Sequence, residues 1–393
     1  MTTTHDRLDA SAAPAAPAAP ALERRHMPDS FSISLARYTN DFSTRLPETF
    51  GPQQDMAGFE PTYRNIVDYI VRITHRIWEG GTPGYASPVT ARDVGYILDT
   101  YHEASEVFDD YGRQTGNAKI VADTRHTTGA FPDIELAAEE VIWAGDAAVG
   151  FHTSHRTIIR GTNDGPSKYG PATGRRIDLL VIANCVAKEN RIFLEHVLYD
   201  TAALIRQMGL DPRAEARRLA AEPPAGWPRD AAAWARLRES TRPPRPLCEA
   251  QPVDGFDPDR FARDAVAALL RGGDARAFRT ADLRFRGTTE RGGGLDALLA
   301  HARELQDAFP GLAPQVDEVY WMGNGRDGYE VAIRWSADVT HRGGFGPAAD
   351  RPVQLWGLSQ QRLRHAAEGW RVTHEWMMFN EFDVMMQVAL SGR

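Results

Sequence analysis

The sequence predicts two α+β domains in tandem, each a cone in which a curved antiparallel sheet wraps around helices that precede it. Three observations support this. The 393 residues are enough for two domains of ordinary size. A proline-rich stretch over 211–253 divides the chain. Segments that precede this stretch recur after it in the same order, which indicates a duplicated unit.

The repeat is visible in three pairs of segments that keep nearly the same spacing. A Phe-Pro pair followed by Glu-Val-x-Trp-x-Gly occurs in both halves, as do an aromatic-Gly-Pro-Ala motif and a longer segment that begins with glutamate and ends with glutamine. The matched pairs are 131–146 with 309–324, 169–172 with 345–348, and 195–207 with 375–387. Two copies are too few for a solenoid, so we interpret each copy as a self-contained domain.

The boundaries follow from composition. We expect the two domains over 58–210 and 254–393, joined by a linker over 211–253 that holds a short helix in DAAAWARLRES. Residues 1–30 contain an Ala-Pro repeat that blocks helix formation and has little to bury, which predicts a disordered tail. This tail has no apolar run typical of a secretory signal.

Periodicity predicts the elements of each unit. Apolar residues at helical spacing indicate helices, and runs rich in β-branched residues between turn signals indicate an antiparallel meander. The helices expected in the first unit are 61–78, 91–104, 117–130 and a closing helix 201–208, and the strands are 135–145, 147–159, 176–187 and 191–199. In the second unit we expect helices 257–271 and 294–308 and strands 314–322, 328–340, 352–364 and 370–379. A bent sheet around a helix leaves an apolar cavity open at one end.

Composition and charge exclude several classes of function. The net charge of −8 provides no footprint for a nucleic-acid backbone. No apolar run approaches the roughly 20 residues of a membrane helix. Two cysteines, Cys185 and Cys248, cannot form a disulfide framework, which favours a reduced, cytoplasmic setting. His152 and His155 fall on opposite faces of one strand, so they cannot bind a metal ion together, and we expect no metal site.

Several motifs of the first unit resemble a known family. They are Phe-Pro-Asp at 131–133, Gly-Asp at 145–146, Pro-Ala-Thr-Gly-Arg-Arg at 171–176 and Glu-x4-Asp-x6-Gln-x-Gly at 195–209. Together they resemble the SnoaL-like polyketide cyclases of the nuclear transport factor 2 and ketosteroid isomerase superfamily. The resemblance implies a cone-shaped α+β barrel with a hydrophobic pocket, no metal or organic cofactor, and frequent dimers. It also implies ring closure by aldol condensation with an aspartate as acid and base.

The chain departs from this family at the residues that carry the chemistry. The motifs place the catalytic aspartate at Val197 and its histidine neighbour at Ala183, and the equivalent of Val197 in the second unit is Met377. None of these side chains can transfer a proton. The cyclase reaction by that aspartate–histidine pair is therefore not expected here.

Other residues nearby can carry acid–base chemistry. In the strand 191–199, Glu195, Val197 and Tyr199 share one face, which we expect to line the pocket. A carboxyl in an apolar pocket has a raised pKa, which suits a general base; alternatively Glu195 lies at the pocket mouth or in a structural hydrogen bond. Asp200 is either a second catalytic carboxyl or the N-cap of the helix that follows it.

Three further side chains complete the expected site. We expect His152 to face the cavity as a third catalytic group, with a structural histidine as the alternative. Ala183 and Cys185 share a strand face that points inward, so we expect them, with Val197 and Tyr199, to contact the substrate. Without a basic neighbour in the sequence, Cys185 is expected to be a small buried hydrophobe rather than a nucleophile.

The predicted function is a cofactor-independent enzyme that acts by acid–base chemistry on a small, largely apolar carbonyl or ester compound in the first domain. A cyclisation, isomerisation or hydrolysis would each be compatible. The alternative is a binding or scaffold protein without catalysis, because the proton-transfer positions of the family are substituted in both copies. We expect the two units to pack sheet against sheet as an intramolecular pseudo-dimer, with or without further association into a homodimer.

Overall fold

In a computed structural model of the protein, the structure describes residues 54–79, 93–239, 256–289, 291–325, 328–347 and 350–390. The expected tail over 1–30, Cys248 and the end of the expected linker lie outside these residues. None of the helices in the described ranges combines the length and apolarity that crossing a membrane requires.

The first domain is built on a six-stranded sheet with the order β2-β1-β6-β5-β4-β3. Its strands are β1 (Tyr101–Asp109), β2 (Gly112–Thr115), β3 (Glu135–Asp146), β4 (Gly150–Thr162), β5 (Arg176–Lys188) and β6 (Arg191–Tyr199). Its helices are α2 (Ile66–Trp78), the short η7 (Val94–Tyr96) and α3 (Ile97–Thr100), α4 (Asn117–Ala130) and the closing helix α5 (Thr201–Gln207). The curved sheet and these helices form one α+β unit.

The second domain has a six-stranded sheet with the equivalent order, β8-β7-β12-β11-β10-β9. Its strands are β7 (Arg279–Gly287), β8 (Gly292–Gly293), β9 (Gln315–Asn324), β10 (Gly328–His341), β11 (Arg351–Ala366) and β12 (Gly369–Phe379). Its helices are α8 (Pro258–Leu270), the short η9 (Ala275–Phe278), α9 (Leu295–Ala308) and the closing helix α10 (Glu381–Leu390). The repeated strand order confirms the prediction of two α+β units in tandem.

Two details of the prediction are wrong. The helix expected over 91–104 ends at Thr100, and the chain continues as β1. Both sheets are mixed rather than purely antiparallel, because β1 pairs with β6 and β7 pairs with β12 in parallel. The segment after Thr100 reads Tyr-His-Glu-Ala-Ser-Glu. Most of these side chains are exposed or half-buried, and few of them are apolar, so the segment lacks the apolar–polar alternation of a typical strand. Glutamate and alanine favour helices, so local propensity pointed away from the strand.

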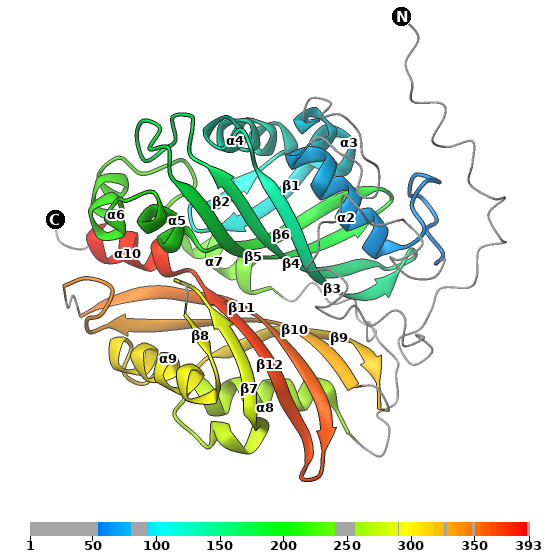
Figure 1. The fold of residues 1–393 in the computed structure, drawn as a ribbon, viewed down its shortest axis with the longest axis vertical. Helices are drawn as coiled ribbons and strands as arrows, with labels where there is room; N and C mark the ends of the chain where they lie inside the picture. The colour runs from blue at the N-terminus through cyan, green and yellow to red at the C-terminus, as the bar shows by residue number, and fades with distance from the viewer. Residues whose placement is uncertain are drawn as a thin grey trace, which may run out of the picture.

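The two sheets face each other, and the helices α2, α3 and α4 of the first domain and α8 and α9 of the second lie on the outer sides (Figure 1). The layer between the sheets contains apolar side chains from both of them. From the first sheet these include Phe108, Ile158, Leu180, Ile182, Leu194 and Leu198; from the second they include Trp356, Leu358, Trp376 and Met378. Side chains alternate along a strand, so the opposite faces of the same strands point toward the helices.

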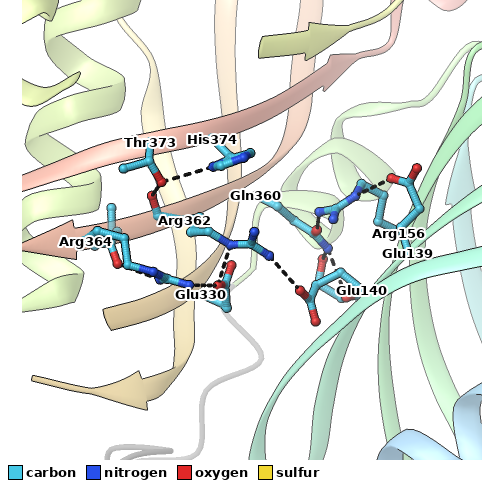
Figure 2. Close-up of polar contacts among 11 residues, drawn as sticks. Glu139, Glu140, Arg156, Glu330, Gln360, Arg362, Arg364, Thr373 and His374 are labelled. Carbon is cyan, nitrogen blue, oxygen red and sulfur yellow. Dashed lines mark hydrogen bonds and ion pairs between the residues drawn. The ribbon is translucent and has the colours of Figure 1, made fainter. Parts of the chain in front are cut away.

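Buried charges are paired across this layer (Figure 2). Arg362 of the second domain donates to Glu330 of its own sheet at 2.7 Å and to Glu140 of the first domain at 3.3 Å. Gln360 donates to the Ser154 hydroxyl at 2.8 Å and accepts from Arg156. A buried charge is costly unless it is paired, and these contacts provide partners for the buried charged groups in the layer between the domains.

The described part of the expected linker is folded. The short helix predicted in DAAAWARLRES is present as α7 (Ala231–Arg238), and α6 (Pro212–Ala221) precedes it. Pro212 occupies the first turn of α6, where a missing N–H costs nothing. The backbone carbonyl of Leu237 in α7 accepts hydrogen bonds from His196 at 3.1 Å and from Arg334 of the second domain.

Candidate functional site

A cavity of about 180 Å³ lies in the first domain, between the sheet and the helices α2, α3 and α4. Most of its wall is apolar and includes Ile73, Ile77, Val107, Ile159, Leu179 and Val197. The polar side chains that reach it include Tyr101, Asp109, Tyr111, Asp123, Glu195 and Tyr199. An apolar pocket with a few convergent polar groups is the usual form of a small-molecule site.

Glu195 is the central polar group of this cavity. Strand β6 presents it on the same face as Val197 and Tyr199, and all three line the cavity. The hydroxyl of Tyr101, at the start of β1, donates a hydrogen bond of 2.9 Å to Glu195 Oε2. Parallel pairing places β1 beside β6, which brings these two residues together.

The surroundings of Glu195 set its proton affinity. Burial raises the pKa of the Glu195 carboxyl to about 7; the hydrogen bond from Tyr101 opposes this shift, and the negative charge of Asp109 adds to it. Burial and the neighbouring Glu195 raise the pKa of the Tyr101 phenol well above its usual value, so this phenol keeps its proton and acts as a donor. Glu195 can therefore both accept and release a proton near neutral pH.

Asp109 is a second cavity carboxyl that the sequence analysis missed. It lies buried at the end of β1, where it accepts hydrogen bonds from the Tyr111 backbone N–H at 2.7 Å and from Gln114 Nε2 at 2.7 Å. Burial raises the pKa of Asp109 to about 6, against the opposing effect of Lys168. The Asp-Asp-Tyr-Gly sequence that begins at Asp109 is a turn signal that could have marked the end of a strand.

Asp200 caps a helix and does not line the cavity. One carboxyl oxygen accepts a 3.3 Å hydrogen bond from the Ala203 N–H in the first turn of α5, and the other accepts from the Thr289 N–H of the second domain at 2.5 Å. Of the two alternatives for Asp200, the N-cap describes its position in the structure. The β6 strand ends at Tyr199, so the side chain of Asp200 turns toward the helix N-terminus.

His152 also lies outside the cavity, which corrects the expectation that it faces inward. It projects from the opposite side of β4 from the cavity residue Ile159, and its Nδ1 is 3.6 Å from Glu318 Oε1 of the second domain. His155 shares the face of Ile159, is buried, and contacts the Thr157 hydroxyl at 2.9 Å. Alternation separated the two histidines as expected, but the inward face was assigned to the wrong one.

Ala183 and Cys185 lie on the expected face of β5, opposite Val197 and Glu195 of β6. Neither of them is among the residues that line this cavity, and their contact with a substrate stays a prediction. Cys185 instead packs into an apolar cluster with α2, and burial raises the pKa of its thiol well above the usual value. This supports the interpretation of Cys185 as a buried hydrophobe.

The equivalent place in the second domain has a different chemistry. Glu375 corresponds to Glu195, and it is held in a buried ion pair by Arg279, whose Nε and Nη2 lie 2.7 Å and 3.0 Å from its two oxygens. Arg279 pairs with Val372 in the same register in which Tyr101 pairs with Ile192. An ion pair of this kind engages both oxygens of the carboxyl group.

Other cavity groups are also replaced in the second domain. Gly287 occupies the place of Asp109, and Phe379 occupies that of Tyr199. The fully buried Trp335 packs against Gly357, where a Cβ would lie 2.3 Å from the indole. In the second domain Arg279 thus pairs the charge of Glu375, and the Trp335 indole occupies interior space beside Gly357.

Within the described ranges, no group of three or more histidine, cysteine, aspartate or glutamate side chains is arranged to hold a metal ion. The cavity carboxyls Glu195 and Asp109 are instead engaged by Tyr101, Gln114 and backbone N–H groups.

No protein-family model matches the chain, and no curated protein matches it in sequence. Solved structures do. The similar structures include a candidate SnoaL-like polyketide cyclase, other candidate polyketide cyclases and a ketosteroid isomerase-like protein. This is the family that the sequence motifs resemble.

The likenesses are low in identity and each covers about one domain. A candidate SnoaL-like polyketide cyclase from Jannaschia sp. CCS1 is 14% identical, with a TM-score of 0.29, over 36% of this chain and 91% of that protein. IdmH, a candidate polyketide cyclase from Streptomyces antibioticus, is 16% identical, with a TM-score of 0.29, over 36% and 97%. The ketosteroid isomerase-like protein from Erwinia carotovora atroseptica is 18% identical, with a TM-score of 0.26, over 31% and 92%.

Proposed function

We propose that the first domain is a cofactor-independent acid–base catalyst that acts on a small, largely apolar carbonyl or ester compound, with Glu195 as the proton-transfer group. The observation that carries this proposal is the position of Glu195 in an apolar cavity, hydrogen-bonded to Tyr101 and with a pKa of about 7. A general base is most effective when its pKa lies near the working pH.

The geometry suggests how the proton moves. Among the described residues, Tyr101 alone hydrogen-bonds to the Glu195 carboxyl, and it does so through Oε2, which leaves Oε1 for a substrate. The ionised carboxyl would remove a proton from the carbon next to a carbonyl group and return it at the new position. Asp109, with a pKa of about 6, lies in the same cavity and can serve as the second proton carrier. Two carboxyls with different pKa values provide an acid and a base in one site.

The alternative is a binding protein without catalysis. It is favoured by the apolar side chains Val197 and Ala183 at the positions where the resembled family carries its catalytic pair. In this case Glu195 and Tyr101 would only orient a bound molecule. The two functions differ in one measurable property: a catalyst converts its bound compound and depends on the Glu195 carboxyl to do so, whereas a binding protein does not convert it.

The test begins with the full chain incubated in a metabolite extract, with mass spectrometry to identify the retained compounds. Turnover of those compounds is then compared between the wild type, Glu195→Gln and Asp200→Asn. We expect Glu195→Gln to bind and to lose turnover by about 10²–10⁴-fold, the usual contribution of a general base. Asp200→Asn is the matched control, because asparagine caps a helix as well as aspartate does and Asn380 holds this place in the second domain.

Turnover by Glu195→Gln at the wild-type rate would discard the catalytic proposal. Retained compounds that are bound but not converted by the wild type would favour the binding protein. The comparison of turnover requires that both variants remain folded at the assay temperature.

We propose further that the two domains form an intramolecular pseudo-dimer. Equivalent residues make equivalent contacts near the shared layer: Arg156 pairs with Glu139 at 2.9 Å, and Arg334 lies 3.7 Å from Asp317, which corresponds to Glu139. Contacts that repeat in this way are typical of a two-fold interface. Because the second domain covers the sheet face of the first, we expect a monomer of 43.5 kDa in sedimentation experiments. A dimer mass would show that a further surface associates.

A further inference from the structure

The closing helix of the second domain lies against the cavity wall of the first. Helix α10 runs beside α5 and α6 (Figure 1). The ring of Phe382 in α10 contacts Tyr111, with ring centroids 6.1 Å apart, and meets Tyr169 edge-on at 6.3 Å. Both tyrosines line the cavity. A side chain of the second domain therefore supports the wall of the candidate site from outside.

The next residue of this helix makes a polar connection to the same wall. Asp383 is fully buried. Its carboxyl accepts a hydrogen bond from the Trp227 indole at 2.6 Å and forms an ion pair with Arg229 Nη2. The other terminal nitrogen of Arg229 donates to the backbone carbonyl of Asp109 at 3.1 Å. Arg229 thus bridges a carboxylate of the second domain to the residue that places a carboxyl in the cavity.

Two further contacts hold the turn that carries Asp109. Its next residue, Asp110, accepts a 2.7 Å hydrogen bond from the Thr201 hydroxyl in α5. Gly112 lies against the segment that contains Arg229, and a Cβ there would be 2.1 Å from the Gly226 carbonyl oxygen. The turn is held between α5, the 226–229 segment and, through Arg229, helix α10.

The contact is reciprocal. The turn after β7 in the second domain reaches the first, where the Thr289 N–H donates to Asp200 at the start of α5. Thr289 corresponds to Tyr111, so in each domain the turn between the first two strands contacts the closing helix of the other domain, or the cap of that helix. This symmetry makes the approach of α10 to the cavity a feature of how the domains dock.

We propose that Asp383 and Arg229 are positioning residues for the cavity of the first domain: they hold the turn that carries Asp109 and Tyr111, so the cavity is complete only when the second domain is docked. This inference rests on the proposed function in one respect, that the cavity of the first domain is the functional site. It assigns the second domain a role in shaping the site, although its own glutamate is held in an ion pair.

The test follows the titration of the Asp109 carboxyl by ¹³C NMR in the full chain, with the signal assigned from its loss in Asp109→Asn. The charged groups around this carboxyl are Lys168, Asp110, Asp123, Glu195 and Arg229. Asp383→Asn removes none of these groups, although it releases Arg229 from its ion pair. We expect it to free the turn, let water reach Asp109 and lower its midpoint by about one pH unit toward the ordinary value.

Two further variants separate positioning from charge and from general destabilisation. Arg229→Lys keeps the positive charge but cannot bridge two partners, so we expect the same downward shift. Glu381→Gln is the control, because Glu381 is also buried in α10 but pairs with Arg291 and Thr289 rather than with the turn. We expect Glu381→Gln to lower the melting temperature without moving the Asp109 midpoint.

An unchanged Asp109 midpoint in both Asp383→Asn and Arg229→Lys would overturn the proposal, as would an equal shift in Glu381→Gln. If Asp383→Asn does not fold, Arg229→Lys decides alone. The measurement needs no substrate. If Glu195→Gln keeps wild-type turnover, the catalytic proposal fails, but this inference can still be tested and can still hold.

Discussion

Glu195 lies in a cavity beside the Tyr101 phenol, whereas Glu375, at the same place in the second sheet, is held in an ion pair by Arg279. The two glutamates differ in this partner, and the partner determines whether the carboxyl can exchange a proton. A phenol stabilises the ionised glutamate by a single hydrogen bond and leaves it free to exchange a proton. A guanidinium neutralises the charge and occupies both oxygens.

The Tyr101 hydrogen bond should be visible in the titration of Glu195. This bond favours the ionised carboxyl and opposes the effect of burial. Tyr101→Phe removes it, so we expect the Glu195 midpoint to rise above the present pKa of about 7. ¹³C NMR titration of the carboxyl measures the change, and a midpoint that falls would mean that the variant has admitted water to the cavity.

Glu195 should make the protein less stable as the pH rises. Its pKa rises from 4.5 to about 7 on folding, so between those pH values the unfolded chain releases this proton while the folded chain keeps it. This ionisation lowers the free energy of the unfolded state relative to the folded state. We therefore expect Glu195→Gln to be more stable than the wild type at pH 8, by about 1–3 kcal/mol, and to lose that advantage below pH 4.5.

Urea unfolding of both proteins at pH 4.5 and pH 8 measures this difference, with the exposed Glu189→Gln as the control that should show none. A stability gain for Glu195→Gln that does not depend on pH would mean that burial of the charge is not its cause.

The ion pair of the second domain should contribute to stability rather than to function. Arg279→Met leaves the buried Glu375 without its partner, which typically costs about 3–5 kcal/mol. Replacing both residues, as Arg279→Met with Glu375→Leu, removes the uncompensated charge and should cost less than Arg279→Met alone. Denaturant unfolding of the two variants tests the order, and equal costs would contradict it.

Trp335 should fill the interior of the second domain without affecting the first. It is fully buried, so Trp335→Ala leaves a cavity and we expect a loss of about 3–5 kcal/mol. Binding of any cavity ligand to the first domain should be unchanged at temperatures where the variant stays folded. A loss of binding in the folded variant would show that the interior of the second domain is coupled to the site.

Local patterns in the chain were sufficient for most of the fold. The matched segments 131–146 and 309–324 indicated the duplication, and strands β3 to β6 and β9 to β12 follow the predicted runs within a few residues. The common face of Glu195, Val197 and Tyr199 also came from alternation alone. These features depend on neighbouring residues, and a period of two or 3.6 residues can be seen in a sequence.

The partners of Glu195 could not be found in this way. Tyr101 contacts Glu195, and Asp109 enters the same cavity, because β1 pairs with β6 in parallel although the two strands are far apart in the sequence. Strand β1 was interpreted in part as a helix, because its half-exposed residues carry helical propensity and little apolar alternation. Long-range strand pairing overrode that local preference.

Residue patterns along the chain were enough to predict two related α+β units, opposite orientations of His152 and His155 on one strand, and a common face for Glu195 and Val197. Which of the two strand faces is covered by helices depended on the three-dimensional packing. The helices cover the face of β4 that carries His155, and the second domain covers the face that carries His152. Alternation separates two faces but does not say which of them will be buried under helices, because that depends on packing between distant segments.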